Sequence, residues 1–130
     1  MKVTFLSMDE DKNKVFFESD ASICEDEIVF ADKSLTDTTL YLRFEPDRLN
    51  LRREGQVFMR LSFRQHHKTD GFYRDSFGLE IPLTVLCTVL KVEAKKTIVH
   101  YELWWDEQMK TKHKILLLFE ESLATCLFFM

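Results

Sequence analysis

The stretch that decides the fold is LNLRREGQVFMRLSFRQHHKTDGFY, residues 49–73. Apolar and polar side chains alternate over residues 56–65, and such alternation is typical of a strand with one buried face. Gly55 lies just before this segment, and glycine readily adopts the backbone of a tight hairpin turn. The stretch therefore predicts a hairpin around Gly55. A second turn is expected over residues 66–71, closed by Gly71, before a short strand over residues 72–78.

The rest of the chain repeats this pattern of short alternating segments separated by charged turns. The segments lie at residues 2–8, 14–19, 27–32, 38–44, 48–52, 79–92, 97–105 and 112–120. The 79–92 segment is expected to bend or bulge near Pro82. If the last two segments, 97–105 and 112–120, form a hairpin, Trp104 would lie opposite His113 and His100 would lie near Leu117. The tail, residues 120–130, is the only helix candidate.

Connections this short make neighbouring strands antiparallel. Closure into a barrel removes the exposed edges of a large antiparallel sheet. We therefore expect an all-β fold: one domain over residues 1–130, a single antiparallel meander β-barrel of about 8–10 strands, which leaves room for packed side chains or one small ligand. Residues 121–130 form a short apolar tail to this domain.

Composition excludes several classes of protein. The net charge of −4 argues against a general nucleic-acid binder, because neutralising phosphates requires clustered cations. No segment approaches the ~20 apolar residues that span a membrane, and the N-terminal apolar run is too short for a signal peptide. Three widely separated cysteines fit reduced thiols. We expect a cytoplasmic protein with no nucleic-acid or membrane partner.

The arginines are concentrated in one segment of the chain. All seven lie within residues 41–80, whereas residues 1–40 carry ten acids and four lysines. One hypothesis is that this basic region pairs across the surface with acidic turns from the first third, which is common and individually weak. The other is an anion site, because the guanidinium fork matches a carboxylate or a phosphate.

Four segments together resemble the YwiB-like family of uncharacterised bacterial proteins: LRREGQVFMRLSF, GFYRDSFGLEIPL, IVHYELWWDE and HKILLLFE. The residues that match the family pattern are Arg53, Gly55, Phe63, Tyr73, Phe77, Gly78, Tyr101 and Leu103. The resemblance covers residues 38–120 and implies a calycin-like, lipocalin-related β-barrel, with no established reaction. The family often has a glycine before its third strand, whereas ESDASICEDE has none.

Catalytic and metal motifs are not recognisable in the sequence. Nothing resembles a nucleophile elbow, a Walker loop or a dinucleotide-binding turn. His66 and His67 would point to opposite faces of a strand, so a solvated turn is favoured over a metal site. Cys87 lies among apolar residues, where burial would raise its pKa and leave it inert. We expect no catalytic residue, no cofactor and no metal.

The leading hypothesis is a non-enzymatic barrel of unknown function that binds a small, partly apolar or anionic ligand inside it or at its mouth. Arginines would orient the anion, and aromatic side chains with a polar tip would pack against it. The candidate residues are Arg43, Arg60, Arg64, Tyr41, Tyr73 and Trp104. The alternative is a protein–protein interaction module or a self-associating homo-oligomer, which would use Trp104, the tail or a sheet edge. An enzyme is the third hypothesis.

Overall fold

The computed structural model describes residues 1–126, which form a closed antiparallel barrel of ten strands and one short helix. Each strand pairs with the next along the chain, and β1 closes the barrel against β10. The expected all-β meander barrel is therefore confirmed. The elements are β1 Lys2–Asp9, β2 Lys14–Cys24, β3 Glu27–Ala31, β4 Thr39–Glu45, β5 Arg48–Glu54, β6 Phe58–Phe63, β7 Lys68–Arg74, β8 Glu80–Val92, β9 Lys96–Trp104, β10 Lys110–Phe119 and α1 Leu123–Cys126.

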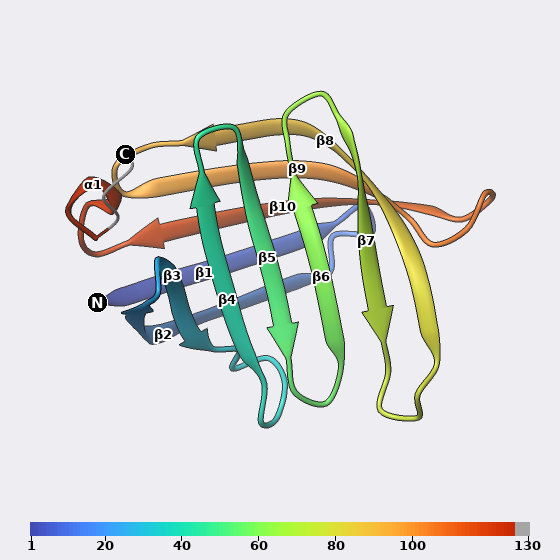
Figure 1. Ribbon diagram of the computed structural model, residues 1–130, viewed down its shortest axis with the longest axis horizontal. Helices are drawn as coiled ribbons and strands as arrows, with labels where there is room; N and C mark the ends of the chain where they lie inside the picture. The colour runs from blue at the N-terminus through green and yellow to red at the C-terminus, as the bar shows by residue number, and fades with distance from the viewer. Residues whose placement is uncertain (127–130) are drawn as a thin grey trace.

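The barrel is flattened into two layers whose strands cross (Figure 1). Strands β4 to β7 form one layer, and β1, β2, β9 and β10 cross behind them; β8 curves from one layer to the other. The register of β8 against β9 is irregular between Cys87 and Val89, whereas Pro82 stays in register opposite Phe72. The irregularity therefore lies at Thr88, where an extra residue bends the strand. The sequence had suggested a position near Pro82, and that prediction was wrong.

The inner faces of the strands supply one continuous core. Alternate residues of each strand are buried, as in β4, where Leu40, Leu42 and Phe44 are at most 2% exposed. Aromatic rings contact one another across the interior, and the Phe63 and Tyr101 centroids are 4.7 Å apart. Since the inner positions are occupied by this core, the polar positions of the same strands face outward.

The second predicted turn is shorter than expected. Strand β7 begins at Lys68, so Gly71 lies within a strand and does not close a turn. A Cβ at Gly71 would lie 2.9 Å from the Arg60 carbonyl oxygen and 3.2 Å from Leu61 Cδ2. The glycine is thus explained by close packing in the barrel wall and not by a turn. The loop between β7 and β8 covers residues 75–79, which the sequence had assigned in part to a strand.

The β9–β10 hairpin also differs in register from the prediction. Trp104 pairs with Lys110, while His113 pairs with Tyr101. Within the loop, the Asp106 carboxylate accepts hydrogen bonds from the Gln108 and Met109 amides, both at 2.7 Å. The shift of three positions brings His113 onto the inner face, where its ring stacks on Tyr101 at 5.1 Å. Lys114, and not Leu117, lies opposite His100.

The helix predicted over residues 120–130 is present only as α1, and residues 127–130 lie outside the described residues. Leu123 is fully buried at one end of the barrel, and its amide donates to the Ala94 carbonyl at 2.7 Å. Within residues 1–126, no helix has the length and apolarity needed to cross a membrane.

Candidate functional site

Arginine side chains gather on the outer face of the β4–β6 layer. Arg43, Arg52 and Arg60 come from three consecutive strands, and they face outward because Leu42, Leu51 and Leu61 occupy the inner face. The register fixes their neighbours. Arg52 lies directly opposite Tyr41 on one side and Arg60 on the other. In the same way, Asn50 lies between Arg43 and Ser62. The result is a polar grid over the outside of three strands.

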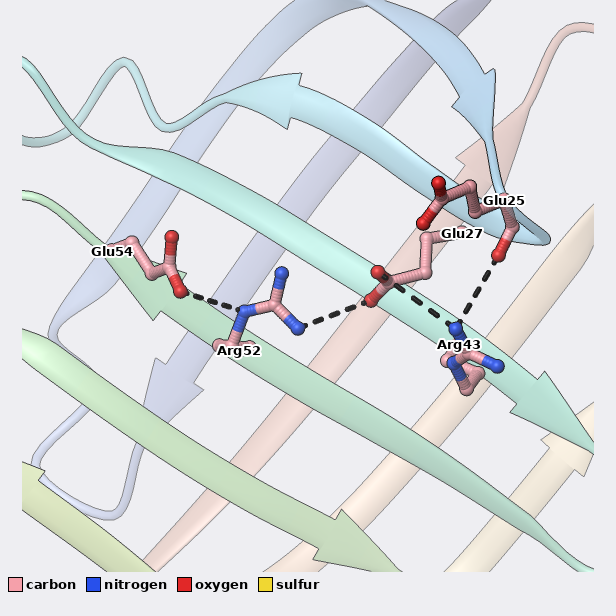
Figure 2. A network of polar contacts seen from close by, with 5 residues as sticks. All are labelled: Glu25, Glu27, Arg43, Arg52 and Glu54. Carbon is pink, nitrogen blue, oxygen red and sulfur yellow. Dashed lines mark hydrogen bonds and ion pairs between the residues drawn. The ribbon is translucent and has the colours of Figure 1, made fainter.

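Two of these arginines are held by carboxylates (Figure 2). Arg52 Nε lies 2.9 Å from Glu54 Oε1, and its Nη1 lies 3.4 Å from Glu27 Oε2. Glu27 also approaches Arg43 Nη2, at 4.0 Å, and the same nitrogen donates to the Glu25 carbonyl at 3.3 Å. Glu27 is well covered, with a side chain only 16% exposed. The network restrains Arg43 and Arg52. Glu27 comes from the first third of the chain, as the surface-pairing hypothesis predicted, but it lies in β3 and not in a turn, and Glu54 lies outside that third.

Tyr41 supports the same network from below. Its ring lies under the Arg52 guanidinium, with Cζ 4.0 Å from the ring centroid. This contact combines cation–π attraction with apolar packing, and it leaves the edge of the guanidinium free to donate hydrogen bonds.

Arg60 differs from its neighbours, because no carboxylate within residues 1–126 forms an ion pair with it. It is exposed, and it faces the like charge of Arg52 across the β5–β6 pair. The buried Ser62 Oγ beside it has no hydrogen-bond partner in the described part of the chain. Unused donors and unneutralised positive charge therefore remain on this face.

These side chains border a shallow cleft of about 340 Å³. Its lining contains four arginines against two carboxylates, so the local charge is positive on a chain whose net charge is −4. Hydroxyl and amide groups from Tyr41, Asn50 and Ser62 complete the polar surface. The lining residues are Glu27, Tyr41, Arg43, Arg48, Asn50, Leu51, Arg52, Arg60, Ser62 and Asp70.

Only half of the candidate residues predicted from the sequence come together. Tyr41, Arg43 and Arg60 share the cleft, on the outside of the barrel and not inside it. Arg64 instead pairs with Asp47, with 3.2 Å between Nε and Oδ2. The other two candidates, Tyr73 in β7 and Trp104 in β9, also lie outside the cleft.

Tyr73 and Trp104 lie apart from the cleft on different faces of the barrel. Tyr73 packs beside the core, with its ring edge-to-face against Trp105 at 5.6 Å. Trp104 is on the outer face of β9, where Lys110 Nζ lies 5.2 Å from its ring centroid. Arg52, Asn50 and Ser62 are the residues that the prediction missed. Their outward phase was readable from the alternation, but their adjacency depends on the strand register.

His66 and His67 lie in a turn and Cys87 lies in the core, so a structural role accounts for all three. His66 and His67 lie in an exposed turn, and within residues 1–126 no group of three or more His, Cys, Asp or Glu residues could hold a metal ion. Cys87 is fully buried, and this burial raises the pKa of its thiol to about 11, in the direction expected from the sequence. Cys24 and Cys87 are both free thiols.

The fold and this face define a class: a closed antiparallel barrel with a basic outer surface on one layer. The model of a domain of unknown function, DUF1934, matches residues 3–117, and the chain belongs to that family. A crystal structure of the ywiB protein from Bacillus subtilis is similar over 90% of this chain and 87% of that one, with 14% sequence identity and a TM-score of 0.59. A search of curated proteins gave no match.

These comparisons confirm the resemblance to the YwiB-like family. At this level of identity the structural likeness concerns the fold alone. The finer relationship to calycins and lipocalins stays a prediction.

Proposed function

We propose that the protein is a non-enzymatic binder of a small anionic ligand, which docks in the cleft on the outer face of β4 to β6. The observation that carries this proposal is Arg60, an exposed guanidinium that has no carboxylate partner among the described residues and faces Arg52. A carboxylate or phosphate bound beside Arg60 would neutralise its charge. It would also accept hydrogen bonds from two forked donors.

Partial neutralisation of the surrounding arginines supports selectivity for small anions over nucleic acid. Glu27 and Glu54 already contact Arg52, so the free positive charge is confined to the neighbourhood of Arg60. A polyanion needs a longer track of unpaired cations. The ligand on this account is a compact carboxylate or phosphate whose apolar part, where it has one, contacts Tyr41.

The proposal includes a cytoplasmic location and no catalytic step. Free thiols at Cys24 and Cys87 are consistent with a reducing compartment. The raised pKa of Cys87 and its full burial argue against a role as a nucleophile.

Isothermal titration calorimetry with pyrophosphate and with citrate tests the proposal. We expect the wild-type protein to bind at least one of them with Kd of roughly 1 mM or lower, and more weakly as salt is raised. Arg60→Gln should weaken binding about tenfold or more, because it removes a charged hydrogen-bond donor. Arg64→Gln is the matched control, since Arg64 is a neighbouring arginine outside the cleft, and it should bind as the wild type does. Equal binding by all three proteins would reject the site.

A further inference from the structure

A second surface lies on the opposite layer of the barrel, on the outside of β2, β1, β10 and β9. The register places four apolar side chains in one row across these strands: Phe16 opposite Leu6, Leu6 opposite Leu116, and Leu116 opposite Ile98. Phe16 is 64% exposed, and Leu118 in the adjoining row is 40% exposed. We call this set the apolar row. Clustered apolar residues on an outer face mark an interaction surface more strongly than scattered ones do.

The sequence of β10 indicates that this face is meant to be covered. Residues 115–119 are five consecutive apolar residues, ILLLF. Ile115, Leu117 and Phe119 are buried in the barrel core, so Leu116 and Leu118 belong to the outer face. A strand that is apolar on both faces is typical of a sheet with both faces covered. Within residues 1–126, no strand or helix covers this outer face.

The surface is also hollowed along the row. A cleft of about 310 Å³ runs beside Leu6, Met8, Ile98 and Leu116. Side chains of a partner could therefore interdigitate with it, as they do between the two sheets of a β-sandwich.

Strand β2 carries opposite charges on the two sides of the apolar row, whereas β9 and β10 place lysines on both sides, Lys96 on one and Lys114 on the other. On one side, Lys14 and Lys114 form no ion pair with any described residue. On the other side, Glu18 pairs only loosely with Lys2, at 3.8 Å, and both side chains are 53% exposed. Lys14 and Glu18 belong to the same strand and lie two positions on either side of Phe16.

We propose that this face binds a second copy of the chain about a twofold axis that runs along the apolar row. That axis places Phe16 against its own symmetry mate and exchanges the two flanks. Lys14 of each copy then lies over Glu18 of the other, so the two facing β2 strands form two ion pairs. A surface that is complementary to itself in this way forms a closed isologous dimer. Aligned sheets in such a contact cross at about 30° and lie about 10 Å apart.

The partner is inferred to be a second copy because Lys14 and Glu18 of β2 are complementary to each other across the proposed axis. A lipid surface would meet the exposed Glu18 carboxylate directly beside the apolar row. The arginine cleft lies on the other layer, so both copies keep it open to solvent (Figure 1).

Sedimentation equilibrium over a range of concentrations tests the proposal on the full chain. We expect the wild type to approach twice its monomer mass of 15.5 kDa. Phe16→Glu should raise the dimer dissociation constant at least about tenfold, because it puts two carboxylates face to face on the twofold axis. Leu79→Glu is the matched control: Leu79 is 56% exposed in the β7–β8 loop, and the dimer should persist.

Charge reversal separates the proposed geometry from non-specific association. Lys14→Glu and Glu18→Lys should each weaken the dimer, and the double variant should restore most of the affinity. Circular dichroism of every variant checks that the barrel is intact. A wild-type monomer at the highest soluble concentration would overturn the proposal and assign the face to another partner. A dimer that Phe16→Glu leaves unchanged, or a double variant no better than the singles, would overturn it as well.

Discussion

Replacing Arg60 with glutamine should stabilise the free protein while abolishing its stabilisation by anions. Arg60 and Arg52 face each other directly across β5 and β6, and Arg60 has no carboxylate partner among the described residues. Like charges at opposite positions of an antiparallel pair are unfavourable by roughly 0.2–1 kcal/mol. For a chain of this size 1 kcal/mol corresponds to roughly 4 °C in Tm, so Arg60→Gln should raise Tm by up to about 4 °C at low salt. The difference should shrink as salt screens the pair.

A bound anion should reverse that order. At a ligand concentration ten times Kd, the native wild type gains about 1.4 kcal/mol, or roughly 6 °C, whereas the variant gains little. Differential scanning calorimetry with and without pyrophosphate should therefore show the two Tm values crossing. Arg64→Gln, which loses only the contact with Asp47, should respond to the anion as the wild type does. A variant that is less stable than the wild type without anion, or equally stabilised by it, would refute the reasoning.

Three further predictions concern the folding of the barrel. Asp26→Gly should stabilise the protein by about 1 kcal/mol in denaturant unfolding, because Asp26 has a φ of 65° in the β2–β3 turn and glycine adopts that backbone without strain. Unchanged stability would contradict this. Arg53→Met should destabilise the protein by about 3–5 kcal/mol, since Asp32 is fully buried and its Oδ2 lies 2.8 Å from Arg53 Nε. The double variant with Asp32→Ala should recover part of the loss, and a merely additive effect would count against a buried pair. Burial lowers the pKa of His113 below its usual 6.5, so the unfolded chain binds the proton more readily. The free energy of unfolding should therefore fall as pH drops below about 6.5, and His113→Gln should flatten that slope in denaturant titrations; an unchanged slope would contradict this role of His113.

The strands were predictable from alternation because each has one inner face that the core must fill. Residues 56–65 illustrate this: Leu61 and Phe63 are buried, and Arg60 and Ser62 face outward as expected. The short connections then left the antiparallel meander as the simplest topology. The β2–β3 turn forms without the glycine common in the family, because Glu25 and Asp26 both adopt positive φ.

Register was harder to predict than strand location, and the candidate site depends on register. A glycine in a sequence is equally consistent with a turn and with close packing against a neighbouring strand. Gly71 was therefore predicted to lie in a turn, although it packs against Arg60. Side chains brought together by pairing, such as Arg52 and Arg60, are eight residues apart in the sequence and become neighbours only once the hairpin is aligned. Tyr73 was grouped with the arginines for its chemistry, but its phase in β7 places it beside the core.

The most direct test of the proposed site is to observe the guanidinium groups during an anion titration. Nitrogen-15 NMR of the arginine Nε–Hε resonances follows each of the seven side chains separately. Addition of pyrophosphate should shift the signals of Arg60 and Arg52, and those of Arg64 and Arg74 should stay in place. Shifts spread equally over all the arginines, or none at Arg60, would contradict an anion site on the outer face of β4 to β6.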